Sequence, residues 1–166
     1  MKAKNIIRVS FLSVLFLFAV LSSVFAQDKK ETTKNMVESG QYIFKARYVL
    51  PQTGLSRALT SDYDLTVSES AIVSYLPYFG RAYVAPIDPL QGGIKFNSSK
   101  FQYTTETAKK DGWNITIIPK DVSDVQKLYL HISSTGNATL QVISTNRQPI
   151  SFNGYIEENN QPKKAF

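Results

Sequence analysis

The sequence contains no cysteine and a single histidine among its 166 residues. Thiolate catalysis, zinc sites built on cysteine and histidine, and iron–sulfur clusters held by cysteine are therefore excluded. Charged residues are also scarce, at 19%, while hydrophobic residues make up 43%, and this balance excludes an intrinsically disordered chain. We expect one packed domain without a metal or cofactor, since a chain of this length forms a core without such support.

Positive charge is only slightly in excess once the amino terminus is set aside. The full chain carries a net charge of +6 from 19 basic and 13 acidic residues. Lys2, Lys4 and Arg8 lie at the start, so 16 basic residues remain and the net charge falls to +3. Proteins that bind nucleic acid gather lysine and arginine on one face. The remaining charges are spread along the chain, and we predict no nucleic-acid partner.

The first 26 residues have the layout of a secretory signal peptide. The positively charged start is followed by an apolar run of 11 residues, Phe11 to Leu21, and then by a segment that ends in the small residue Ala26. This order predicts cleavage between Ala26 and Gln27. The alternative is an uncleaved membrane anchor, but a span needs about 20 apolar residues and serines interrupt this stretch.

A cleaved signal peptide predicts an exported protein, periplasmic or extracellular, with no membrane span after cleavage. The junction carries no cysteine, so lipid anchoring through cysteine is not available. Residues 27–39 are charged and polar, and we expect a mobile spacer with a helical turn at its end. We expect a single β-domain over residues 40–157 and a polar tail over residues 158–166.

Apolar and polar residues alternate with a period of two through most of the predicted domain. Tyr42, Phe44, Ala46 and Tyr48 are predicted to share one face of a strand. No segment longer than ten residues shows an apolar stripe at helical spacing. Further strands are predicted at residues 62–67, 71–75, 81–85, 101–108, 113–118, 128–132, 138–142 and 150–156.

Short turns separate these segments, and short connections favour antiparallel neighbours because parallel strands need long crossovers. The expected fold is therefore all-β. It is an antiparallel meander of about eight strands, closed into a small barrel or folded into a two-layer sandwich. Leu128, Leu130 and Leu140 are predicted to face its core.

Four stretches carry a family likeness: Leu59–Tyr63, Tyr75–Tyr83, Gly92–Phe96 and Asn146–Phe152. Through them the sequence from about Gln41 to Glu157 resembles the bacterial secreted family known as domain of unknown function 4251. The second stretch, Tyr-Leu-Pro-Tyr-Phe-Gly-Arg-Ala-Tyr, is long and unusual in composition. The resemblance implies a small protein outside the cytoplasm of a Bacteroidota-type bacterium. It implies no activity and no functional residue.

Few residues are suited to an enzymatic reaction. His131 stands alone on the polar face of its predicted strand, and no Gly-x-Ser-x-Gly sequence supports a catalytic serine. Asp62 and Asp64 fit a turn-flanking and a solvated carboxylate better than a calcium site or an acid–base pair. The pair Gly92-Gly93 lacks the spacing of a phosphate-binding loop and is interpreted as a turn or bulge. We predict no catalytic residue and no metal site, and therefore no enzyme.

An aromatic cluster has the most bearing on function. Four rings and an arginine lie within nine residues, and the predicted ligand- or partner-binding residues are Tyr75, Tyr78, Phe79, Arg81 and Tyr83. Tyrosine and arginine recur at recognition surfaces because they combine apolar area with polar groups. The alternative is that the rings fill one end of the barrel, since aromatic residues mostly supply core area.

Two functions agree with these observations. The first is a ligand-binding protein of the bacterial cell envelope that holds an unknown small molecule at the barrel mouth or the aromatic cluster. The second is a structural or protein–protein interaction module that docks on an envelope protein through an exposed edge or patch. A concave pocket of about 300–1,000 Å³ favours the first function. A filled barrel with a flat apolar patch favours the second.

Overall fold

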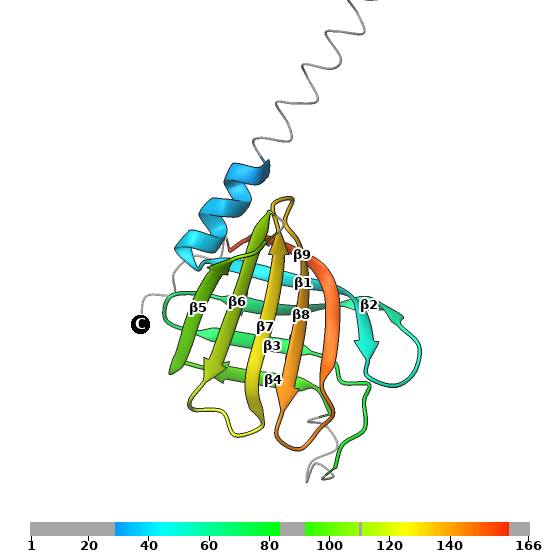
Figure 1. Ribbon diagram of the computed structural model, residues 1–166. Coiled ribbons are helices and arrows are strands. Elements are labelled where there is room, and N and C mark those ends of the chain that lie inside the picture. The colour runs from blue at the N-terminus through cyan, green and yellow to red at the C-terminus, as the bar shows by residue number, and fades with distance from the viewer. Residues whose placement is uncertain (1–28, 84–91, 110, 160–166) are drawn as a thin grey trace, which may run out of the picture.

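The computed structural model describes residues 29–83, 92–109 and 111–159 (Figure 1). These residues contain nine antiparallel strands. The strands are β1 (Tyr42–Pro51), β2 (Arg57–Val67), β3 (Ile72–Leu76), β4 (Ile94–Ser98), β5 (Phe101–Thr107), β6 (Gly112–Pro119), β7 (Val125–Ser133), β8 (Asn137–Ser144) and β9 (Ile150–Glu158).

The strands form one sheet in the order β4-β3-β2-β1-β9-β8-β7-β6-β5. The chain runs as two meanders, and β9 returns to pair with β1 and joins them. Figure 1 shows β1–β4 crossing behind β5–β9, so the sheet curls into a nearly closed barrel. Within the described residues β4 and β5 are the edge strands of the sheet, each paired on one side only. The predicted all-β antiparallel meander is confirmed, and it takes the barrel form.

Two strand predictions differ from the structure. A strand was expected over residues 81–85, but residues 81–83 belong to none of the nine, and Ala82 makes only an isolated bridge with Arg147. Residues 84 and 85 lie outside the described part. Conversely, β4 follows Gly93 directly and was not predicted. Its five residues do alternate, with Lys95 and Asn97 exposed between less exposed neighbours, so the pattern was present in the sequence.

Apolar side chains from both halves of the sheet fill the barrel interior. Leu128, Leu130 and Leu140 are each at most 1% exposed, which confirms the prediction that they face the core. Phe44 of β1 and Phe152 of β9 are fully buried beside them. The pattern of period two therefore identified the inner face correctly over most of the domain.

A β-bulge in β1 moves Tyr48 to the outer face. The spacing predicts Tyr48 on the same face as Phe44, but the strand register shifts between Ala46 and Tyr48 against both neighbouring strands. Tyr48 is 52% exposed, so this prediction is wrong. The physical reason is that a bulge inserts one residue and switches the faces of the side chains beyond it. Gly154 lies opposite, where a Cβ atom would collide with the main-chain oxygen of Lys45.

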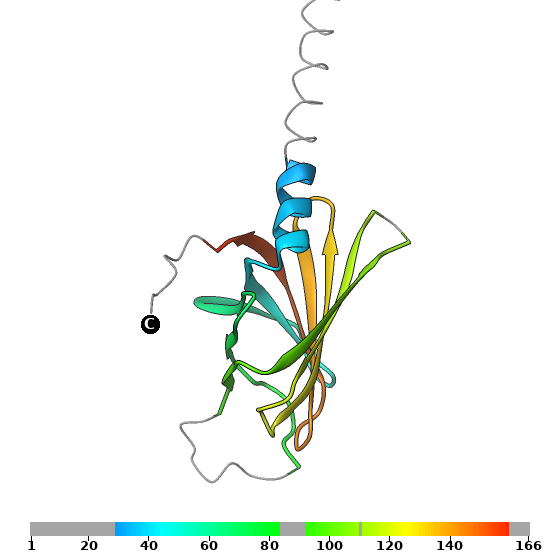
Figure 2. The ribbon, with the colours of Figure 1, turned by 90° about the vertical axis from the view of Figure 1, so that its left-hand side faces the viewer.

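Residues 29–39 form a helix, which corrects the expectation of a polar spacer with one helical turn. Figures 1 and 2 show the helix standing at one end of the barrel. Met36 and Val37 are buried in the same core cluster as the strand residues, and Lys30 forms an ion pair with Asp111 at 2.9 Å. The helix was not predicted because two adjacent apolar residues among charged ones do not form a recognisable apolar stripe.

The helix ends at Gly40 through a backbone motif that favours glycine. Gly40 has φ of 61°, and its N–H donates to the carbonyl of Val37. The N–H of Gln41 donates to the carbonyl of Met36. This pair of hydrogen bonds satisfies carbonyls that the end of a helix leaves open, and it directs the chain into β1.

The predicted signal peptide, its cleavage site between Ala26 and Gln27, and most of the predicted tail lie outside the described residues. Strand β9 runs to Glu158, one residue past the predicted end of the domain. Over the described ranges, no helix is long and apolar enough to cross a membrane.

Candidate functional site

The outer face of the barrel carries a row of polar residues that crosses five strands. Strand pairing places Asn114, His131, Thr139, Asn153 and Tyr48 opposite one another on β6, β7, β8, β9 and β1 in turn. Nδ1 of His131 lies 2.9 Å from Oδ1 of Asn114, and Oγ1 of Thr139 donates to Oδ1 of Asn153 at 3.0 Å. These contacts link neighbouring polar groups across the strands.

A groove of about 530 Å³ lies against this row. Its lining includes the small residues Gly154 and Ala138, and Tyr48 and Tyr155 contribute aromatic rings. The bulge in β1 creates this arrangement by turning Tyr48 outward. The lining residues are Arg47, Tyr48, His131, Ser133, Asn137, Ala138, Thr139, Asn153, Gly154 and Tyr155.

Arg47 is held against Tyr155 in the first groove. Its guanidinium carbon lies 5.3 Å from the centroid of the Tyr155 ring, and Nη2 donates to the Tyr155 hydroxyl at 3.0 Å. The two contacts fix both side chains and leave a planar donor group beside an aromatic face. Such a pair combines apolar contact with directed hydrogen bonds.

A second groove of about 350 Å³ adjoins the first and shares His131 and Thr139 with it. Tyr129 lines this groove, and Nζ of Lys127 lies 5.2 Å from the centroid of its ring. Thr116, Tyr129, Gln141 and Ser151 lie opposite one another in a second cross-strand row. The two rows extend the polar surface along the strands.

The grooves carry basic groups without acidic ones. Among the described residues that line them, Arg47 and His131 are the basic ones, and none is acidic. The nearest part of the outer face is neutralised, since Nζ of Lys45 lies 2.9 Å from Oδ2 of Asp64. The hydrogen bond that Lys45 donates to Asp64 raises the pKa of Lys45, although burial opposes the rise. The grooves therefore suit a neutral or anionic ligand.

The predicted aromatic cluster divides between the barrel end and the surface. Tyr78 packs against the core, and its hydroxyl donates to the carbonyl oxygens of Arg81 and Gln148, at 2.8 Å and 3.1 Å. Burial raises the pKa of Tyr78, while the charge of Arg147 opposes the rise. Tyr78 thus supports the fold. For this residue the structure agrees with the alternative interpretation, in which the rings fill one end of the barrel.

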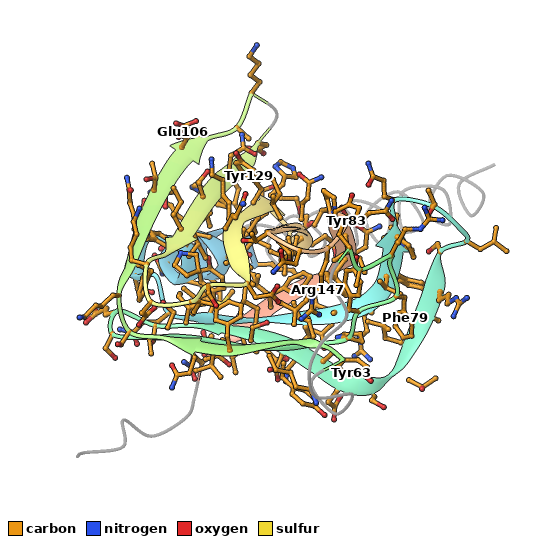
Figure 3. The ribbon with its side chains drawn as sticks, turned by 90° about the horizontal axis from the view of Figure 1, so that it is seen from below. Tyr63, Phe79, Tyr83, Glu106, Tyr129 and Arg147 are labelled. Carbon is orange, nitrogen blue, oxygen red and sulfur yellow. The ribbon has the colours of Figure 1, made fainter. Side chains whose placement is uncertain are left out.

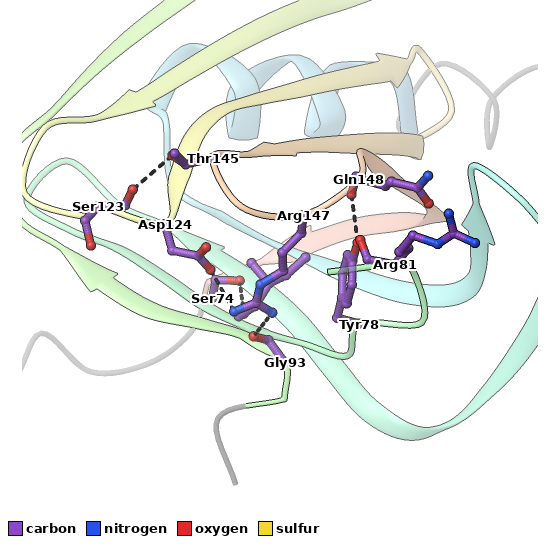
Figure 4. Close-up of polar contacts among 10 residues, drawn as sticks. Ser74, Tyr78, Arg81, Gly93, Ser123, Asp124, Thr145, Arg147 and Gln148 are labelled. Carbon is purple, nitrogen blue, oxygen red and sulfur yellow. Dashed lines mark hydrogen bonds and ion pairs between the residues drawn. The ribbon is translucent and has the colours of Figure 1, made fainter. Parts of the chain in front are cut away.

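The other four predicted residues are exposed. Tyr75 is on the outer face of β3, stacked on Tyr63 with ring centroids 5.7 Å apart and with Lys95 over its ring. Phe79 lies under the guanidinium of Arg57. Figure 3 shows Phe79 and Tyr83 apart from Tyr129, and Figure 4 shows the Arg81 side chain directed away from that of Arg147. None of the five lines either groove.

Arg147 connects three segments at the lower end of the barrel (Figure 4). Its Nη2 atom lies 2.8 Å from Oδ2 of Asp124, its Nη1 atom donates to the carbonyl of Gly93 at 2.8 Å, and its guanidinium stacks on Tyr78. The side chain is 11% exposed. Three of the four stretches that carry the family likeness thus meet here, and they close the barrel end rather than form an open site.

Sequence reasoning missed the grooves because they depend on strand pairing. His131 was interpreted as a surface histidine, and it is exposed, but the sequence does not show that Asn114 and Thr139 lie beside it. A signal was available in the outward positions of β7, β8 and β9, which are polar or aromatic at every second residue apart from Ile143. Asp62 is exposed but lies within β2 and not beside a turn, and Asp64 pairs with Lys45 instead of being solvated, so both details of the expectation are corrected.

Comparisons with known proteins agree with the fold. The model of a family described as domain of unknown function (DUF4251) matches residues 25–156. The crystal structure of a DUF4251 family protein from Bacteroides eggerthii is similar, with a TM-score of 0.60 and 16% sequence identity. The alignment covers 81% of this chain and 90% of that chain. No curated protein matches the sequence significantly. At this identity the structural likeness shows the fold alone.

Proposed function

Because the chain belongs to the DUF4251 family, whose description assigns no activity, we propose a function from the barrel itself. The protein is a non-enzymatic binding domain, exported to the bacterial cell envelope, and its outer face binds a saccharide. The observation that carries this proposal is the groove of about 530 Å³ beside the polar row. Its size is within the range of about 300–1,000 Å³ that is usual for ligand sites.

The chemistry of the groove fits a sugar. Tyr48 and Tyr155 offer flat apolar faces for the C–H groups of a sugar ring. Arg47, Asn137 and Asn153 offer hydrogen-bonding groups to its hydroxyls. Because acidic residues are missing from the described lining of both grooves, a uronic acid is accommodated as well as a neutral sugar.

A binding role is favoured over catalysis by the partners of His131. Its Nδ1 atom contacts the amide oxygen of Asn114, whereas a catalytic histidine is commonly oriented by a carboxylate. The described lining of the grooves provides no carboxylate to act as a general acid or base. The groove residues are therefore suited to hold a ligand rather than to transform it.

Export to the periplasm or the cell exterior is part of the proposal. It is supported by the charged start, the apolar run of 11 residues and the small residue at position 26. The absence of cysteine leaves no residue for a lipid anchor at the cleavage junction. A binding domain for saccharides would meet its ligand in that compartment.

The alternative is an interaction module that docks on an envelope protein through an exposed sheet edge. One observation favours it, since β5 is an end strand of the sheet and pairs with β6 alone among the described strands. An open edge of this kind accepts another strand through main-chain hydrogen bonds.

The experiment titrates the chain from Gln27 onward with saccharide probes and monitors binding by two-dimensional amide NMR. The probes are a malto-oligosaccharide, a chitin oligosaccharide and an oligogalacturonate. Binding should shift the amide signals of the groove residues, and Tyr155→Ala or Arg47→Ala should weaken it by about tenfold or more. Tyr83→Ala is the matched control, because Tyr83 is 64% exposed and lines neither groove.

Three outcomes are distinguishable. Shifts confined to the grooves and lost in the groove variants support the proposal. Shifts confined to residues 75–83 and lost in Tyr83→Ala would move the site to the segment predicted from sequence. The absence of shifts with all three probes at millimolar concentration contradicts saccharide binding.

A further inference from the structure

Strand β5 presents an open edge on the side away from β6. It is an end strand of the sheet, and its seven residues pair with β6 in an unbroken register (Figure 1). Edge strands are usually protected by a proline, a lysine within the strand or a bulge. The sequence Phe-Gln-Tyr-Thr-Thr-Glu-Thr has neither proline nor lysine, and the pairing with β6 shows no bulge.

The hydrogen-bond pattern shows which main-chain groups face this open edge. The N–H of Ala108 donates to the carbonyl of Gly112 at 2.9 Å, and the N–H of Lys120 donates to the carbonyl of Lys100 at 2.7 Å. Both contacts continue the β5–β6 register, so the even-numbered residues of β5 bond to β6. The odd-numbered residues therefore direct their N–H and C=O groups to the open edge: Phe101, Tyr103, Thr105 and Thr107.

We propose that a second copy of this chain pairs with this edge, β5 against β5, about a twofold axis at Thr104. Antiparallel pairing about that residue places Tyr103 opposite Thr105 and Phe101 opposite Thr107 of the other copy. These are the residues whose main-chain groups are directed outward, so each copy can exchange hydrogen bonds along the whole strand. A twofold interface of this kind is self-complementary.

A second copy fits this edge as the occupant because its register opposes no like charges. In this register Glu106 faces Gln102 of the other copy, Lys100 faces Ala108, and Lys109 faces Ser99. No like charges are opposed, whereas an axis at Glu106 would place that carboxylate opposite itself. The threonine and aromatic pairs along the edge are also favourable in antiparallel strands. Phe101 and Tyr103, each partly exposed beside the core, would gain cover.

The contact is confined to one strand from each copy, so its area is at the low end for specific interfaces and the dimer should be reversible. The measurement is sedimentation equilibrium of the chain from Gln27 onward, over low to high micromolar concentration. We expect a monomer–dimer equilibrium. Hydrogen exchange at high concentration should slow at residues 101, 103, 105 and 107 relative to low concentration.

Three variants test the geometry. Thr105→Pro removes an outward N–H without removing a bond to β6, and it should weaken dimerisation by about tenfold or more. Thr105→Val is its matched control, since it keeps the N–H and suits a strand, and it should dimerise like the wild type. Thr104→Lys places two positive charges at the axis, and its loss of dimer should be partly reversed by salt.

Circular dichroism must show that each variant is folded. If Thr105→Pro does not fold, Thr104→Lys tests the proposed interface in its place. A wild-type chain that stays monomeric up to high micromolar concentration overturns the proposal. Dimerisation that persists unchanged in folded Thr105→Pro or Thr104→Lys also overturns it, because the contact would then lie elsewhere. Saccharide binding by the grooves is independent of either result.

Discussion

Tyr42 and Tyr103 place their phenol oxygens 3.2 Å apart, although β9, β8, β7 and β6 lie between their strands in the sheet. A residue of the end strand β5 can reach β1 only if the sheet curls around the core. The contact thus records the closure of the barrel. Tyr42 is fully buried, and burial raises its pKa well above the ordinary value, with Tyr103 adding to the rise.

The first prediction follows from that raised pKa. In a titration monitored by phenolate absorbance, Tyr42 should ionise at a pH well above the ordinary tyrosine value. A tyrosine with a raised pKa stabilises the fold below the unfolded value of about 10, and this stability is lost as pH rises through the folded value. Tyr42→Phe should remove the last-titrating phenol and cost about 0.5–1.5 kcal/mol. An unchanged final step in that variant would contradict the assignment.

The alternating pattern predicted the inner face because one side of each strand is buried. Leu128, Leu130 and Leu140 are examples where local sequence and global packing agree. The pattern failed at Tyr48, where a bulge depends on the approach of Gly154 from the neighbouring strand. A bulge of this kind has no fixed sequence signature, so its position was not predictable.

The candidate site was less predictable than the fold. Asn114, His131 and Thr139 are far apart in sequence and become neighbours through strand register alone. The sequence shows that each faces outward but not which residues are opposed. The aromatic segment was predicted as a binding site because its rings lie close together in the sequence. In the structure Tyr78 packs against the core, whereas Phe79 and Tyr83 are exposed. Closeness in sequence did not imply one shared surface.

The second prediction separates those two roles in adjacent residues. Tyr78→Ala removes a ring packed on the core and two hydrogen bonds, and should lower the free energy of unfolding by about 3 kcal/mol. Phe79→Ala removes a ring that is 42% exposed, so its cost should stay within about 1 kcal/mol. Urea denaturation of both variants measures the difference. Equal losses would mean that Phe79 also supports the fold.

The third prediction concerns the helix over residues 29–39. Val37 is 1% exposed, and Val37→Ala should cost about 2 kcal/mol because two buried methyl groups are lost. Asn35→Ala, at an exposed position of the same helix, should change stability by less than about 0.5 kcal/mol. The two variants are compared by thermal denaturation. Equal stability in both would show that the segment behaves as the mobile spacer expected from its composition.

The last prediction concerns Asp121, which joins the connection after β6 to the corner between β4 and β5. Its carboxylate accepts hydrogen bonds from the Ser98 hydroxyl and from the main-chain N–H groups of Ser99 and Lys100, the latter two at 2.9 Å and 3.1 Å. The bond from Ser98, with those from the backbone, lowers the pKa of Asp121 to about 2. The exposed carboxylate is therefore held in its charged form by donors at this corner.

A carboxylate with a lowered pKa stabilises the fold above its unfolded value of about 3.9, and this stability is lost as pH falls through the folded value. The wild type should therefore lose stability between about pH 4 and pH 2 through Asp121. In Asp121→Asn this contribution is absent, so its unfolding free energy should fall less over the same interval. Glu31→Gln, at an exposed position of the helix, is the control and should follow the wild-type profile. Parallel profiles for the wild type and Asp121→Asn would show that the corner does not depend on the charged carboxylate.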